Sequence, residues 1–255
     1  MAVSFQNTAI IIPAYNSEQS IGTCLESLKQ YKDLGAKIIV VNDGSQDKTE
    51  QLASLFDVQV ISNLRNRGVA YSRNKGVKAC ESEFLVFIDA DVKFSGLPGL
   101  LEPIINNSAA ATGATLAWPN LAPGVSSDWV GIRNLWVYEG QSNNAMALSG
   151  FQSECGAITR KAFEACGGFN TKYQSSGMEE FELGHDLERL GMKNILLPHV
   201  FYTAYHKTLF PRLKDLVRRT ALWMPLMFKR RKLESEGSAG GKSEGLPVLL
   251  TIGSL

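Results

Sequence analysis

Apolar and polar positions follow two different periods along the first part of the chain. Short runs that are apolar at every position alternate with segments of helical spacing, such as Ile21, Leu25 and Leu28. Uninterrupted apolar runs are typical of strands buried on both faces of a parallel sheet. The pattern predicts strands over 9–12, 37–41, 58–62 and 84–88, and helices over 21–28, 47–56 and 68–79. Strands that alternate with helices indicate an α/β fold with crossover helices.

The pattern is weaker after Pro98. It predicts strands over 109–117 and 155–159, a partly exposed Trp-rich segment over 125–138 and a short helix over 160–166. A further helix is expected over 178–190, because Leu183, Leu187 and Leu190 form one stripe and Gly191 is a typical C-terminal stop. We therefore expect a single domain over residues 1–206, with a mostly parallel sheet flanked by helices.

Length and charge restrict the class of protein. The 255 residues with a net charge of +1 suffice for one α/β domain, and such balanced charge argues against a nucleic-acid partner. The start, Met1 to Asn7, does not have the pattern of a secretory signal, so we expect a cytoplasmic location. Cys24, Cys80, Cys155 and Cys166 form no C-x-x-C pair and are expected to be small buried residues.

The chain changes character after residue 206. Residues 207–232 mix basic and apolar side chains, which fits a peripheral helix on the inner face of a membrane or an amphipathic segment packed on the domain. Residues 233–245 have the composition of a flexible linker. Residues 246–255 are apolar but too few to span a bilayer, which needs about 20 residues. One hypothesis is that a longer parent chain continues into a membrane segment.

Polar residues follow three of the predicted strands. These are Pro13-Ala14-Tyr15-Asn16, Asn42-Asp43-Gly44-Ser45 and Asp89-Ala90-Asp91. Ligands of open parallel sheets bind beyond the carboxyl ends of the strands, so we expect these residues at one site. Two carboxylates leaving one strand on the same side could hold Mg²⁺ or Mn²⁺, which prefer oxygen ligands. The alternative for an isolated D-x-D is a solvated turn.

An ordered set of motifs resembles the family 2 glycosyltransferases with the GT-A fold. It comprises Ile11 to Asn16, Val41 to Asp47, Asn66 to Gly76, Phe87 to Asp91, Gly167 to Asn170 and Glu179 to Leu183. The resemblance extends over about residues 8–206. It implies an inverting, metal-dependent enzyme that takes a sugar from a nucleotide-diphosphate donor, most commonly a uridine one in this family.

The resemblance also implies roles for single residues. Pro13, Tyr15 and Asp43 would surround the nucleotide base with Val41 close by, and Asp89 would face the ribose and the metal. Asp91 would be the principal metal ligand, His206 a further metal or phosphate contact, and Arg73 a contact of the base or the diphosphate. The remaining residues expected at the nucleotide are Ala14, Asn16 and Ala90.

Glu180 occupies the place of the family's catalytic base, where the family usually has Asp. The alternative interpretation is that Glu179 and Glu180 only stabilise a helix N-terminus through its dipole. Glu182 is a weaker candidate for the base. Glu179, Trp118 and Trp136 are expected on the acceptor side, because aromatic faces stack on sugar rings, although core packing explains such Trp residues equally well.

The expected reaction is transfer of one sugar to a hydroxyl group of an unknown glycan, lipid-linked or small-molecule acceptor, for example in the synthesis of a cell-surface glycan. Two rival functions remain. A catalytically impaired relative would bind the sugar nucleotide without turnover. A sugar-phosphate nucleotidyltransferase is less favoured, since Pro13 to Asn16 is not the Gly-rich, basic loop that we expect of that class.

Overall fold

A computed structural model describes residues 5–106, 112–121, 146–148, 150–173 and 178–204. The chain divides into two compact units, one made of residues 1–120 and 143–205 and the other of residues 121–142 and 206–255. Apart from Leu121, all described residues belong to the first unit. The expected subdivision of residues 207–255 lies outside the described residues and stays a prediction.

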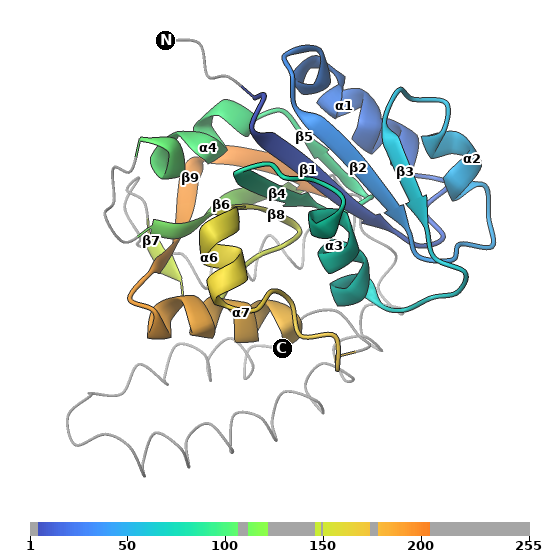
Figure 1. Cartoon of the computed structure of the whole chain (residues 1–255). Helices are drawn as coiled ribbons and strands as arrows, with labels where there is room; N and C mark the ends of the chain where they lie inside the picture. The colour runs from blue at the N-terminus through green and yellow to red at the C-terminus, as the bar shows by residue number, and fades with distance from the viewer. Residues whose placement is uncertain (1–4, 107–111, 122–145, 149, 174–177, 205–255) are drawn as a thin grey trace. The chain divides into compact units, whose positions relative to one another are not determined.

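Strands and helices alternate through most of the first unit (Figure 1). The strands are β1 (Thr8–Ala14), β2 (Lys37–Asn42), β3 (Gln59–Ser62), β4 (Phe84–Ile88), β5 (Val92–Phe94), β6 (Thr112–Leu121), β7 (Met146–Leu148), β8 (Cys155–Thr159) and β9 (Lys193–Ala204). The helices are α1 (Ile21–Asp33), α2 (Thr49–Ala53), α3 (Val69–Lys78), α4 (Leu97–Ile105), α6 (Arg160–Ala165) and α7 (Met178–Arg189). None of these described helices is long and apolar enough to cross a membrane.

The strands form one mixed sheet in the order β3-β2-β1-β4-β8-β6-β9-β5, with β7 paired to β9. The part from β3 to β4 is parallel, and all seven residues of β1 in its centre are buried. This confirms the α/β fold that the apolar runs predict. Beyond β4, the strand pairs β4-β8, β8-β6, β9-β5 and β7-β9 are antiparallel, with Ile88 opposite Cys155 and Val92 opposite Ala204. The start of β8 and the end of β9 therefore reach the edge at which β4 ends.

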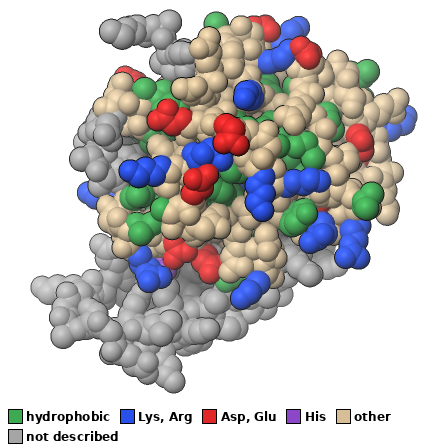
Figure 2. Space-filling model, in the orientation of Figure 1, with side chains coloured by type: hydrophobic (Ala, Val, Ile, Leu, Met, Phe, Trp, Pro, Cys, Tyr) green, Lys and Arg blue, Asp and Glu red, His purple; other side chains and the backbone are tan. Residues whose placement is uncertain are grey.

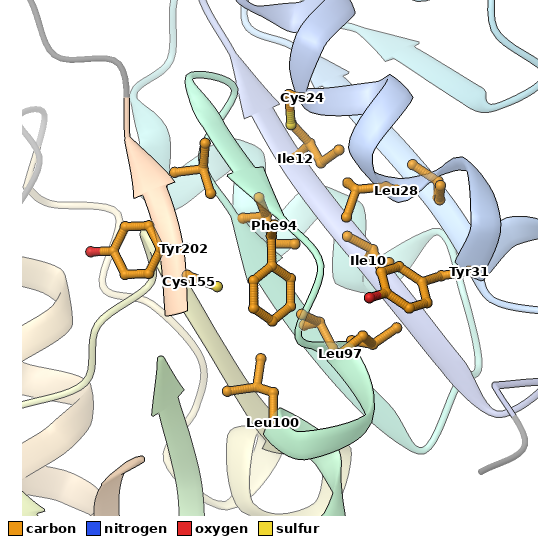
Figure 3. Close-up of a cluster of buried hydrophobic side chains, with 14 of the residues drawn as sticks. Ile10, Ile12, Cys24, Leu28, Tyr31, Phe94, Leu97, Leu100, Cys155 and Tyr202 are labelled. Carbon is orange, nitrogen blue, oxygen red and sulfur yellow. The ribbon is translucent and has the colours of Figure 1, made fainter. Parts of the chain in front are cut away.

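Helices cover both faces of the sheet (Figure 1). Alternate side chains of a strand point to opposite faces, so a strand that is apolar throughout, such as β1, needs a cover on each face. On one face Ile10 and Ile12 of β1 pack with α1, α4 and β9 in a continuous apolar cluster. Figure 3 shows this cluster with Leu28 of α1 and Phe94 between the strands and helices. The cluster fixes β1 and β4, the strands whose ends carry the polar motifs.

The other face of the sheet carries α3 and α6. Phe87, Phe151, Phe163 and Phe169 form an aromatic cluster there, with ring centroids 5.0 to 6.0 Å apart. Helix α3 lies directly on β1 through Gly76, since a Cβ at that position would lie 2.5 Å from Ile11 Cγ2. Both packings hold α3 close to the sheet, which brings Arg73 of this helix to the edge of the sheet.

Four described elements go beyond the sequence-based expectations, namely β5, α4, β7 and β9. Helix α4 begins after Gly96 and tolerates Pro98, because the first helical N–H groups have no partner inside the helix. Helix α2 ends at Ala53 rather than at residue 56. The cysteines largely follow the expectation, since Cys24, Cys80 and Cys155 are buried and Cys166 is half-buried.

Candidate active site

The polar residues that follow β1, β2 and β4 meet at one edge of the sheet. The parallel pairing aligns Ala14 with Asn42, and the Asp43 N–H donates to the Ala14 carbonyl at 2.8 Å. Tyr15 follows with 45 % of its surface exposed. The sheet thus presents an open aromatic side chain next to the carboxylates, which is a suitable arrangement for a nucleobase and a ribose.

The loops after β1 and β2 hold each other in place. The Asn16 N–H donates to Ser45 Oγ at 3.0 Å, and the Gln46 N–H donates to Asn16 Oδ1 at 2.9 Å. Asn16 has a φ of +49°, a conformation that Asn tolerates better than most residues. Asn16 is expected at the nucleotide from its sequence motif, and in the structure its amide oxygen also fixes the neighbouring loop.

Asp43 organises the chain before α3. Its Oδ1 accepts from Asn63 Nδ2 at 2.7 Å and from the Arg67 N–H at 2.9 Å, and its Oδ2 accepts from the Gly68 N–H at 2.9 Å. The residue is 3 % exposed. Gly44 completes the contact, because a Cβ there would lie 2.6 Å from the Arg65 carbonyl carbon. In this structure the carboxylate is therefore engaged with protein groups.

The remaining residues expected near the nucleotide base lie below the surface. Pro13, Ala14 and Val41 are buried, with Val41 fully so and packed near Gly76 of α3. Such positions shape the floor of a site rather than expose side chains to a ligand.

Asp89, Ala90 and Asp91 form a tight turn between β4 and β5. The Val92 N–H donates to the Asp89 carbonyl at 3.0 Å, so the chain turns instead of continuing as a strand. Ala90 is buried, while the Asp89 side chain is 34 % exposed and Asp91 is half-buried. Two partly open carboxylates on one turn are a donor set that suits Mg²⁺ or Mn²⁺.

Arg73 connects this turn with the start of α7. Its Nη2 lies 2.7 Å from Asp89 Oδ1 and 4.0 Å from Glu180 Oε1, and its Nη1 lies 3.1 Å from Glu179 Oε1. Arg73 is 1 % exposed. Burial by itself would lower the pKa of Arg73, but the charges of Asp89, Glu180 and Glu179 raise it. The guanidinium is thus a buried cation among three carboxylates. The resemblance implies that Arg73 contacts the base or the diphosphate, and the contacts seen in the structure are to these carboxylates.

Glu179 and Glu180 are adjacent but differ in environment. Glu179 is 0 % exposed and faces Arg73, so its carboxylate lies inside the protein and not on an open acceptor side. The Glu180 side chain is 20 % exposed. Its Oε1 accepts from the Ser153 N–H at 3.0 Å and from the Ser153 hydroxyl. Glu180 is therefore the member of the pair that a ligand can reach.

Glu154 and Tyr202 join the site without having been predicted from the sequence. The Tyr202 hydroxyl donates to Glu154 Oε2 at 2.9 Å, and the Asp89 N–H donates to the Glu154 carbonyl at 3.1 Å. Burial, and then the charges of Asp89 and Asp91, raise the pKa of Glu154 to about 7. Burial is the larger cause of this shift, and the neighbouring carboxylates of Asp89 and Asp91 add to it.

Three predicted site residues are not characterised by the structure. Trp118 lies in β6, whereas Trp136 and His206 lie outside the described residues. Strand β9 ends at Ala204, opposite Val92. Over the parts of the chain that the structure describes, no group of three or more His, Cys, Asp or Glu residues is arranged to hold a metal.

A groove of about 590 Å³ lies between α3, the turn before Phe169 and α7. Tyr71, Lys75 and Lys78 line it from α3, and Glu182 and Asp186 from α7. At 3.6 residues per turn the three α3 residues lie opposite Arg73 on the helix, so the groove is separate from the charged centre. Figure 2 shows basic and acidic side chains mixed over this face of the molecule.

Comparison with known proteins gives consistent matches. The sequence profile of Glycosyl transferase family 2 matches residues 9–167. The putative glycosyltransferase EpsH of Bacillus subtilis is 38 % identical over 87 residues, which cover 32 % of this chain and 25 % of the relative. A teichoic acid poly(glycerol phosphate) polymerase of Staphylococcus epidermidis is 34 % identical over 113 residues, covering 37 % and 16 %. These matches span a quarter or less of the relatives' own length.

A solved structure resembles the fold over nearly the whole chain. It is a mannosyltransferase from Pyrobaculum calidifontis in complex with GDP-Man and Mn²⁺, with a TM-score of 0.68 and 18 % identity. The superposition covers 97 % of this chain and 68 % of that one. At this identity the likeness concerns the fold, which is the GT-A fold that the sequence motifs predict.

Proposed function

The chain belongs to Glycosyl transferase family 2, and from this premise we propose that it transfers a sugar from a nucleotide-diphosphate donor to a hydroxyl group, with inversion. One observation carries the proposal. Arg73 Nη2 lies 2.7 Å from an Asp89 oxygen and 4.0 Å from a Glu180 oxygen, so the end of β4 and the start of α7 converge. The carboxylate proposed to bind the donor, Asp89, therefore lies close to the proposed base, Glu180.

Donor binding is assigned to the edge of the sheet beyond β1, β2 and β4. Tyr15, an exposed aromatic side chain at this edge, would lie against the base, and Asp43 would hold the loop that forms the wall. Asp89 and Asp91 would hold a divalent cation, Mg²⁺ or Mn²⁺. When bound, such a cation supplies positive charge for the diphosphate of the leaving group. The solved mannosyltransferase contains GDP-Man and Mn²⁺, which supports this class of ligands.

Glu180 is assigned as the general base. Its carboxylate would accept the proton of the acceptor hydroxyl while that oxygen attacks the anomeric carbon from the face opposite the diphosphate. The bond from the anomeric carbon to the diphosphate oxygen breaks as the new glycosidic bond forms, and a single displacement inverts the configuration. A base must lie about 2.6–3.2 Å from the oxygen that carries the proton, and Glu180 is the partly exposed carboxylate of its pair.

The acceptor is proposed to be a glycan, a lipid-linked sugar or a small molecule with a free hydroxyl group. A teichoic acid polymerase and an Eps glycosyltransferase among the relatives favour a role in a cell-surface polysaccharide. The expected peripheral membrane contact through residues 207–232 remains part of this proposal, because a surface-bound enzyme would meet lipid-linked acceptors directly.

The function is tested by screening UDP- and GDP-sugars for binding and for release of the nucleoside diphosphate, with Mn²⁺ or with EDTA. The wild-type protein should bind one donor more tightly with Mn²⁺, and Asp91→Asn should lose that difference. Glu180→Gln should bind the donor and release at least about 100-fold less nucleotide, the effect typical of a lost general base. Equal binding with Mn²⁺ and EDTA would contradict the metal assignment. Donor binding without turnover by the wild type would indicate a catalytically impaired relative instead.

A further inference from the structure

The carboxylate of Glu180 is fixed by a residue from a distant part of the chain. The Ser153 N–H donates to Glu180 Oε1 at 3.0 Å, and the Ser153 hydroxyl donates to the same oxygen. Ser153 is 0 % exposed, whereas the Glu180 side chain is 20 % exposed. Two donors of one buried residue therefore anchor one oxygen of a partly open carboxylate.

The segment that carries Ser153 is itself docked on α7. The Phe151 N–H donates to the Glu180 carbonyl at 3.2 Å. Gly184 allows the close approach, because a Cβ there would lie 2.6 Å from the Phe151 nitrogen and 2.7 Å from Gly150 atoms. Gly inside a helix costs about 1 kcal/mol relative to Ala, and here the tight contact explains its presence. The anchor on Glu180 is thus part of a close-packed contact.

The same segment leads into the sheet beside the Asp89 turn. Cys155 of β8 pairs with Ile88 of β4, and the Asp89 N–H donates to the Glu154 carbonyl. Ser153 consequently stands between the turn of Asp89 and the helix of Glu180. The pairing of β8 with β4 sets its position relative to the turn, and the bond from the Phe151 N–H to the Glu180 carbonyl sets its position relative to α7.

A competing partner for Glu180 lies close by. Arg73 Nη2 is 4.0 Å from Glu180 Oε1, while the same guanidinium contacts Asp89 at 2.7 Å and Glu179 at 3.1 Å. A buried cation attracts any carboxylate within reach strongly. Without the two Ser153 donors, the flexible Glu180 side chain would close on Arg73 and turn away from an incoming hydroxyl.

We propose that Ser153 is a positioning residue that holds the Glu180 carboxylate off Arg73 and towards the acceptor hydroxyl. The inference rests on the proposed function, in which Glu180 is the general base. Ser153 touches no reacting atom and acts only through Glu180. Its loss should lower turnover and leave nucleotide binding intact, since Tyr15, Asp43, Asp89 and Asp91 are untouched.

The experiment compares three serine variants in the full chain. Ser153→Ala removes the hydroxyl, Ser153→Thr keeps it, and Ser82→Ala removes a buried hydroxyl that has no hydrogen-bond partner among the described residues. Calorimetry measures the affinity for UDP and for GDP with Mn²⁺, and turnover is the release of nucleoside diphosphate from the donor that the wild type uses. We expect Ser153→Ala to lower turnover about 10- to 100-fold with affinity unchanged within about twofold. Ser153→Thr should restore most of the rate, and Ser82→Ala should equal the wild type.

Two results of this comparison would overturn the inference, and a structural result described below would be the third. One is a Ser153→Ala variant as active as the wild type, and the other is a parallel loss of nucleotide affinity, which indicates a merely structural role. Failure of the proposed function looks different, because the wild type itself would release no nucleotide. Crystal structures of the wild type and Ser153→Ala then decide the inference. A Glu180 carboxylate that moves onto Arg73 supports it, and one that keeps its place refutes it.

Discussion

Replacement of Arg73 by Met should lower the free energy of unfolding by about 3–5 kcal/mol, the usual cost of removing one partner of a buried ion pair. The main contribution comes from Glu179, which is 0 % exposed and would lose the guanidinium that lies 3.1 Å from its carboxylate. Asp89 and Glu180 contribute less, because their side chains are 34 % and 20 % exposed and water can solvate them. The free energy of unfolding of a typical domain is only about 5–15 kcal/mol in total, so the expected loss is a large fraction of it.

The assay is urea unfolding followed by circular dichroism, with a double-mutant cycle. Adding Glu179→Gln to Arg73→Met removes the buried charge and should recover at least about 2 kcal/mol. Lys32→Met is the matched control. Lys32 pairs with Asp57, whose side chain is 95 % exposed, and such surface pairs contribute about 0–1 kcal/mol. The reasoning is refuted if Arg73→Met costs no more than Lys32→Met, or if neutralising Glu179 brings no recovery.

Two further predictions concern the surroundings of the site. The folded-state pKa of Glu154 is raised to about 7 from 4.5, so the folded protein holds a proton that the unfolded chain releases, and stability falls as the pH rises between these values. Without metal, the free energy of unfolding of Glu154→Gln should therefore rise by about 2 kcal/mol relative to that of the wild type when the pH is raised from about 5 to about 8. Urea unfolding of both proteins at both pH values measures this change. A difference between the two proteins that is the same at both pH values contradicts the prediction. Gly44→Ala should destabilise the protein by more than about 2 kcal/mol, because φ is +72° and the new Cβ would lie 2.6 Å from the Arg65 backbone. The control is Gly22→Ala in α1, where the new Cβ has open space and should stabilise the protein by up to about 1 kcal/mol. Melting temperatures of the two variants check this, and equal shifts would disprove it.

The centre of the parallel part of the sheet was predictable because β1, β2 and β4 each contain an uninterrupted apolar run. Thr8–Ala14 and Phe84–Ile88 are buried almost throughout, and the polar residues that end them mark the ligand edge. Asp89 and Asp91 could therefore be assigned to one edge from pattern alone. The structure adds that they lie on a tight turn.

The contacts that bind the site together could not be read from the sequence. Arg73 and Glu179 are 106 residues apart, and Tyr202 and Glu154 are 48 apart. Periodicity reports the face on which a residue lies but not its partner across the sheet. Ser153 carries no motif and becomes meaningful only through the antiparallel pairing of β8 with β4. The Glu179-Glu180 pair indicated a catalytic base, but the sequence does not show which side chain is accessible. The structure distinguishes them, because Glu179 is buried and Glu180 is partly exposed.

The pairing of β5 with β9 has a consequence for synthesis on the ribosome. Strands β1 to β4 are complete once Ile88 has been translated, and they pair among themselves. The next partner of β4 begins only at Cys155, and β5 cannot pair until β9 has been translated, because Val92 lies opposite Ala204. At roughly 5–20 residues per second, the nascent chain carries an open apolar strand edge for several seconds. We therefore expect refolding yields that fall as the protein concentration rises, because an open strand edge can pair with a second chain.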